Sequence, residues 1–110
     1  PHRRNCGQEG FVMQVELSAL AESDFLDIAL YIAADNPDRA FRFVDELQQS
    51  CRGLADRPLR FPVLPGFESR AIRRRVHGHY ALLYVARDDR VQVLRILSSA
   101  MDLDAALGEA

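Results

Sequence analysis

Two amphipathic segments of this sequence meet at Asn36 and Pro37, and that junction restricts the fold more than any other feature. Proline disfavours a helical conformation in the residue before it and fits the first position of a helix. Asn36 is therefore expected to end one helix and to cap the helix that Pro37 begins. Because two helices joined by so short a link run side by side in opposite directions, the sequence predicts an antiparallel helical hairpin.

Apolar residues in both segments recur every three or four positions, which is the spacing of one face of a helix. The first predicted helix extends from its N-cap, Ser18, to about Asp35, and the second extends from Pro37 to about Ala55. The stripes expected to face the core contain Ala21, Phe25, Ile28 and Ile32 in the first helix, and Ala40, Val44, Leu47, Cys51 and Leu54 in the second.

Three large apolar residues, Leu26, Leu30 and Phe41, fall outside these stripes. Apolar side chains left over on a helical hairpin are typical of a groove that accommodates an amphipathic peptide helix. We therefore expect a partner to bind the hairpin at these three residues.

Strand patterns lie on both sides of the hairpin. Apolar and polar residues alternate from Met13 to Leu17, which predicts a short strand before the first helix. Three further strands are predicted over residues 70–76, 80–86 and 91–97, with turns at 77–79 and 87–90. The segment 80–86 is apolar on both faces, so it is predicted to be the middle strand.

The predicted order is β-α-α-β-β-β, an α+β fold in which the helical hairpin packs on a small, mostly antiparallel sheet. Residues 57–68 are expected to form an irregular connection, because three prolines and a glycine interrupt them. The second face of the sheet is expected to be open or half open to a partner.

Residues 13–110 are interpreted as one domain ending in a short helical turn over 101–110. Residues 1–12 are interpreted as a flexible tail, from an expression tag or an upstream translation start.

Composition narrows the class of protein. With 110 residues, 48% of them apolar and 27% charged, the chain is expected to form one globular domain rather than a disordered or fibrous one. The longest apolar run, Tyr80–Ala86, is too short to span a bilayer, and no secretory signal is recognisable, so we expect a cytoplasmic protein. The histidines and the two cysteines lack metal-ligand spacing and there is no glycine-rich nucleotide loop, so neither a metal nor a cofactor is predicted.

Charge is distributed unevenly along the chain. All 14 cationic side chains are arginine. The net charge of −2 conceals a helical half, residues 13–56, at −6 and a strand-rich half, residues 57–100, at +6, with residues 1–12 at +1 and residues 101–110 at −3. Arg73, Arg75 and His77 share one face of a predicted strand. These arginines either form a surface for an anionic partner or pair with the acidic helices as a solvated strand.

Two segments resemble a known family. Tyr31–Leu47, YIAADNPDRAFRFVDEL, and Tyr80–Asp102, YALLYVARDDRVQVLRILSSAMD, resemble the ParE branch of the ParE/RelE superfamily of type II toxin–antitoxin toxins. The shared features are a helix ending in YIA, an Asn-Pro helix start, a downstream RFVDxL, a Y-x-x-x-Y strand and a closing V-x-V-L-R-I-L. They cover nearly the whole chain after Met13, in the order and spacing of the family.

The resemblance implies a plasmid-stabilisation toxin that causes growth arrest and is neutralised by a cognate ParD-like ribbon-helix-helix antitoxin. A heterotetramer of toxin and antitoxin is one assembly that it allows. ParE-like members inhibit DNA gyrase and so stop replication, which is the expected function here, without sequence-specific nucleic-acid binding by the toxin. RelE-like members instead cleave mRNA on the ribosome without a metal. An inactive or repurposed interaction module is the third alternative.

Ribonuclease chemistry needs a base, an acid and cations around the scissile phosphate. His77, His79, Glu68 and Tyr84 are the candidate acid–base groups. The family often carries a histidine after the R-I-L of the last strand, where this chain has Ser98, which is no proton shuttle near neutral pH. We therefore expect an inhibitor of a protein target rather than an enzyme, and no catalytic residue is predicted.

Two sets of binding residues are predicted. The expected target-binding residues are Arg70, Arg73, Arg75, His77, Arg95 and Ser98. The expected antitoxin-binding residues are Leu26, Leu30, Phe41, Arg73 and Arg75.

Overall fold

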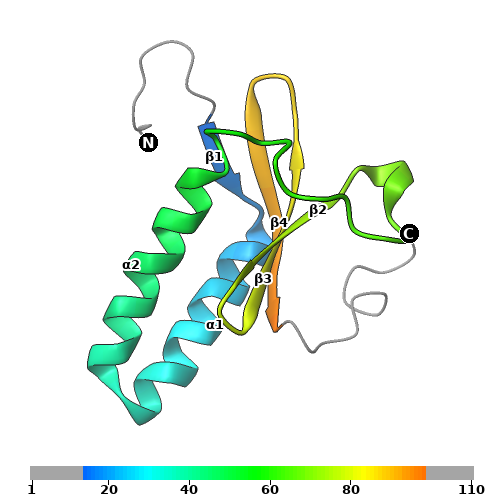
Figure 1. The fold of residues 1–110 in the computed structure, drawn as a ribbon. Helices are drawn as coiled ribbons and strands as arrows, with labels where there is room; N and C mark the ends of the chain where they lie inside the picture. Colours follow the sequence, from blue (N-terminus) through cyan, green and yellow to red (C-terminus); the bar gives the residue numbers. More distant parts are fainter. Residues whose placement is uncertain (1–13, 99–110) are drawn as a thin grey trace.

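The computed structural model describes residues 14–98, and these form two helices packed against a four-stranded sheet (Figure 1). In chain order the elements are β1 (Gln14–Leu17), α1 (Ala19–Asp35), α2 (Pro37–Gly53), the short 3-10 helix η1 (Glu68–Arg70), β2 (Arg73–His77), β3 (Tyr80–Ala86) and β4 (Arg90–Ser98). The predicted α+β fold and its β-α-α-β-β-β order are confirmed. The predicted tail over 1–12 and the predicted helical turn over 101–110 lie outside the described residues.

The strand order in the sheet is β1-β4-β3-β2. β1 pairs in parallel with β4, and the two other pairs are antiparallel, so the sheet is mostly antiparallel as predicted. β3 lies between β4 and β2 and buries five consecutive residues, 81–85, because both of its faces are covered. The prediction that this apolar segment occupies the middle of the sheet is confirmed.

The hairpin of α1 and α2 turns at a single residue. The backbone N–H of Asn36 donates to Ile32 O at 2.8 Å, which ends α1. The side chain of Asn36 accepts from the N–H of Arg39 at 3.1 Å, which caps α2. One asparagine therefore satisfies groups at the end of one helix and at the start of the next, as its place before Pro37 predicts.

The edge of β4 beyond the end of β1 is completed by side chains of the first helical segment. β1 pairs with β4 only as far as Val93. Past that point the Ser18 hydroxyl donates to Leu94 O at 2.7 Å, and Ile96 N donates to the Asp24 carboxylate at 3.0 Å. Polar side chains thus replace the strand partner that β1 is too short to provide.

Two apolar clusters pack on opposite faces of the sheet. The first joins both helices to β3 and β4 and includes Leu47, Tyr84 and Val93, each 0% exposed. The second covers the other face, where Leu64 and Phe67 pack with Leu83 and Val85. The second face, expected to be open or half open, is therefore not fully open, because the connection after α2 brings its own apolar side chains onto it.

The connection is more ordered than its prolines suggest. Val63 forms an isolated bridge with Arg73, and Leu64 N donates to Ile72 O at 2.7 Å. The strand predicted to begin at Arg70 begins at Arg73 instead. The cause is local, since residues 68–70 form a 3-10 turn that ends at Ala71 in the left-handed conformation, with φ of 53°.

Ser18 gives a direct test of the junction between β1 and α1. Its Oγ accepts from Ala21 N at 3.0 Å as well as donating to Leu94 O. Ser18→Ala should lower the free energy of unfolding by about 1–2 kcal/mol, because it removes a helix cap and leaves a partly buried carbonyl without its donor. Urea denaturation followed by circular dichroism measures this change, with the exposed Ser23→Ala as the matched control. Equal effects of the two substitutions would refute the role given to Ser18.

Candidate functional site

An apolar groove lies between α1 and α2. It has a volume of about 290 Å³ and is lined by Glu22, Phe25, Leu26, Ala29 and Val44. Leu30 and Phe41, one helical turn from Leu26 and Val44 respectively, are 59% and 75% exposed, and Leu26 itself is 58% exposed. The prediction that Leu26, Leu30 and Phe41 lie outside the core is therefore confirmed. The hairpin presents these large apolar side chains to solvent.

Arg73 and Arg75 project from β2 to the end of α2 and the connection that follows it. Arg73 Nη1 donates to Phe61 O at 2.7 Å and to Leu59 O at 3.3 Å. Arg75 Nη1 donates to Ser50 O at 2.9 Å, and its guanidinium lies 5.0 Å from the centre of the Phe61 ring. The two arginines share a face, as predicted, and their described hydrogen bonds all go to backbone carbonyls.

These arginines do not pair with the acidic helices. Among residues 14–98, ion pairs within 4.0 Å join Arg90 to Glu16 and Asp89, and Arg95 to Asp24. His77 Nε2 lies 3.9 Å from Glu46 Oε1. Within the described residues, the arginines of β2 therefore form no salt bridges to the helices, and that alternative is wrong.

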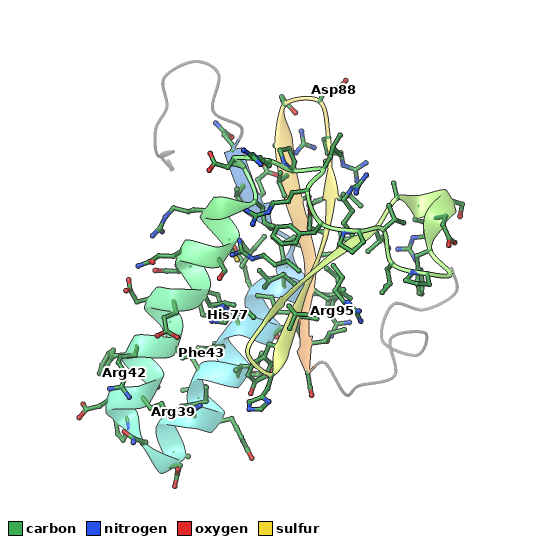
Figure 2. The ribbon with its side chains drawn as sticks, in the orientation of Figure 1. Arg39, Arg42, Phe43, His77, Asp88 and Arg95 are labelled. Carbon is green, nitrogen blue, oxygen red and sulfur yellow. The ribbon has the colours of Figure 1, made fainter. Side chains whose placement is uncertain are left out.

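His77 of β2 contacts two polar residues of α2. Its Nδ1 shares a hydrogen bond of 2.9 Å with the hydroxyl of Ser50, which is 7% exposed, and its Nε2 lies 3.9 Å from Glu46 Oε1. Phe43 packs edge-on against the imidazole and the Tyr80 ring (Figure 2). Ser50 therefore joins α2 to β2 twice, through its carbonyl to Arg75 and through its hydroxyl to His77.

The remaining predicted target-binding residues lie elsewhere. Arg95 forms two hydrogen bonds to the Asp24 carboxylate, from Nε at 2.7 Å and from Nη2 at 3.0 Å, and these raise the pKa of Arg95 above its ordinary value. Ser98 is at the end of β4, opposite Tyr80, and Arg70 is in η1. Of the six predicted target-binding residues, the structure brings Arg73, Arg75 and His77 together on one face of β2, against the end of α2 and the connection.

The candidate acid–base groups are not assembled into one centre. Tyr84 is 0% exposed and donates its hydroxyl to Pro58 O at 2.7 Å, and burial raises its pKa above the ordinary value. Glu68 accepts from Gly66 N at 3.1 Å in the connection, and His79 is exposed in the turn after β2. Within residues 14–98 no three His, Cys, Asp or Glu side chains gather where they could hold a metal ion.

Three residues that shape these surfaces are not predicted from the sequence. Phe61 contacts Arg73 and Arg75, Ser50 joins α2 to β2, and Val44 lines the groove rather than the core. The helical period places Val44 at the edge of the core stripe, so either position agrees with the pattern. No pattern marks Phe61, because its role depends on arginines that lie one residue before it and fourteen residues after it.

The described residues thus make up a small α+β protein with two distinctive surfaces, the apolar groove between α1 and α2 and the face of β2 that carries Arg73 and Arg75. The chain matches the model of the ParE toxin of the type II toxin–antitoxin system parDE over residues 15–103. It therefore belongs to the ParE toxin family of type II toxin–antitoxin systems, and the resemblance noted in the sequence is confirmed.

A solved structure has the same fold. It comes from the chromosomal ParDE toxin–antitoxin system of P. aeruginosa, with 16% sequence identity and a TM-score of 0.66, and the match covers 81% of this chain and 98% of that one. No curated protein sequence matches the chain. None of the helices within residues 14–98 is long and apolar enough to cross a membrane.

Cys51 gives a test of the packing beneath the arginines. Burial raises the pKa of its thiol to about 11 from 9.0, against the smaller opposing effects of Arg75 and Arg52. In a Cys6→Ser variant, iodoacetamide at pH 8 should leave the native chain unmodified over a time that fully alkylates the same chain in guanidinium, because the thiolate is the reactive form. Rapid alkylation of the native chain, measured by mass spectrometry, would contradict this packing.

The same shift predicts a pH dependence of stability. A thiol whose pKa is higher in the folded state stabilises the protein fully below about pH 9, and this contribution is lost as the pH rises to about 11. The expected loss is about 2–3 kcal/mol. Urea denaturation at pH 8 and pH 11 measures it, and Cys51→Ala should show a smaller loss than the parent chain. An equal loss in both would mean that other groups cause the dependence.

Proposed function

We propose that this chain is a toxin neutralised by a cognate ParD-like ribbon-helix-helix antitoxin, and that a segment of this antitoxin binds the groove of the helical hairpin. The observation that carries the proposal is the exposure of Leu26, Leu30 and Phe41 beside an apolar groove. A contiguous apolar surface of this kind on a small protein marks a protein interaction site. An amphipathic helix that lays its apolar face between α1 and α2 would cover it.

The proposed target is DNA gyrase, inhibited by binding rather than by catalysis. Family membership supports this choice. The separation of the acid–base candidates supports it as well, since a metal-free ribonuclease needs a base and an acid on opposite sides of one phosphate. Tyr84 is buried and hydrogen-bonded, and the last position of β4 is Ser98, which is no proton shuttle near neutral pH.

Leu30→Glu and Phe41→Glu test the groove. Each should weaken binding of the cognate antitoxin at least about 30-fold, because a charge placed at the centre of an apolar interface removes a contact of about 2 kcal/mol. Isothermal titration calorimetry with the antitoxin encoded beside the toxin measures the effect.

Leu20→Glu is the matched control for this test. Leu20 and Leu30 are both 59% exposed and both lie on α1, but Leu20 is on the opposite flank of the helix, away from the groove. Its substitution should change the affinity less than about threefold. If all three variants bind the antitoxin as tightly as the parent chain, the antitoxin does not use the groove.

The target is tested by two incubations. Purified chain added to gyrase and supercoiled plasmid should produce plasmid cleaved by gyrase, and addition of the antitoxin should suppress it. Cleavage of transcripts on translating ribosomes, with gyrase unaffected, would replace this proposal with the ribonuclease alternative. Absence of both activities would favour an interaction module.

A further inference from the structure

Three arginines, Arg60, Arg73 and Arg75, meet at Phe61 in the connection after α2. Two more, Arg52 in the last turn of α2 and Arg57 at the start of the connection, are their neighbours in the chain. We call these five residues the arginine cluster. Phe61 is at its centre, because the guanidinium groups of Arg60 and Arg75 lie 5.2 Å and 5.0 Å from its ring and Arg73 donates to its carbonyl. Arg57 accepts from the backbone N–H of Arg60 in the same turn, and Arg52 precedes Gly53, which Arg75 approaches closely.

The charge of this cluster is not neutralised within the described chain. None of its five members lies within 4.0 Å of a carboxylate among residues 14–98, whereas Arg90 and Arg95 are both paired. Like charges held close together repel one another, and an anionic ligand removes that cost. The cluster therefore has the electrostatic character of a binding surface.

The guanidinium groups are held in place before any ligand arrives. The described hydrogen bonds of Arg73 and Arg75 all pass through Nη1, so Nε and Nη2 are not used in them. A guanidinium carries five N–H donors in a rigid plane and binds phosphate through two of them at once. Fixing that plane against a backbone carbonyl and an aromatic ring lowers the entropy lost on binding.

The surroundings of the cluster favour a polyphosphate over an acidic peptide. Among residues 14–98, five of the seven large exposed apolar residues are on the helical hairpin: Leu20, Leu26, Leu30, Tyr31 and Phe41. Leu59 is the one within the cluster. A peptide partner depends on apolar anchors and finds them at the groove, whereas a phosphate backbone needs only cations.

The same geometry favours a duplex over a single strand. Proteins bind single strands by stacking bases on aromatic rings. The Phe61 ring is already in contact with Arg60 and Arg75, so it does not offer a free face for a base. Contacts to phosphates alone match the outer surface of a double helix.

We propose that the arginine cluster binds the phosphate backbone of duplex DNA without reading its sequence. This surface is separate from the antitoxin groove and does not depend on the identity of the target. With a net charge of −2, the chain as a whole is not attracted to DNA, so binding requires this local concentration of arginine.

Arg57→Ala with Arg60→Ala tests the proposal, since both side chains are exposed and neither forms a described hydrogen bond. Fluorescence anisotropy of a labelled 30-base-pair duplex is measured over a series of NaCl concentrations. The parent chain should bind at low salt, and the double variant should bind about tenfold more weakly, with a slope of log K against log [NaCl] smaller by about 2. Circular dichroism verifies that the variant is folded.

Arg39→Ala with Arg42→Ala is the matched control. It removes the same charge from exposed positions near the other end of α2 (Figure 2), about 15–20 Å along the helix from Arg52. The proposal expects this control to bind DNA as the parent does. Equal weakening by both double variants, or no binding by the parent at 50 mM NaCl, would overturn it.

Competitors define the ligand. The labelled duplex should be displaced by unlabelled duplex, and much less by a single strand of equal length or by polyglutamate at equal charge. Displacement by polyglutamate as effective as by duplex would reassign the cluster to an acidic protein partner. Preference for the single strand would overturn the duplex assignment.

Discussion

The edge of β4 beyond Val93 determines where the helical hairpin begins. A strand inside a sheet must find partners for its backbone, and β1 is too short to supply them all. Two side chains near the start of α1 do so: the Ser18 hydroxyl donates to Leu94 O, and the Asp24 carboxylate accepts from Ile96 N. Because these bonds fix where α1 begins and which way it faces the sheet, they also place the hairpin, and with it the groove that α1 forms with α2.

Arginine has a structural role that lysine could not fill. Arg73 and Arg75 bridge β2 to the carbonyls of Phe61 and Ser50, and Arg75 also lies over the Phe61 ring. A planar guanidinium can stack and donate at once, whereas an ammonium is a compact point charge. At these two positions the lysine-free composition of the chain therefore has a physical reason, since the same side chains fasten the connection to β2 and concentrate positive charge.

The two unusual surfaces of the protein differ in chemistry as well as in place. The groove is apolar and belongs to α1 and α2, whereas the arginine cluster belongs to the end of α2, the connection and β2. An apolar groove selects a folded or folding peptide, and a cationic surface selects a polyanion. A toxin with both can be held by one partner while its second surface retains a different specificity.

The sequence by itself determined the helical hairpin, the strands and the family, because Asn36-Pro37, the three-to-four and two-residue periods and the family motifs are carried by neighbouring residues. It also determined that Leu26, Leu30 and Phe41 stay outside the core. Only the tertiary structure decided that Leu64 and Phe67 cover the second face, that Arg95 joins Asp24 from 71 residues away, and that Arg73 and Arg75 surround Phe61. Such contacts depend on which distant segments the sheet brings together, and no local period in the chain encodes that pairing.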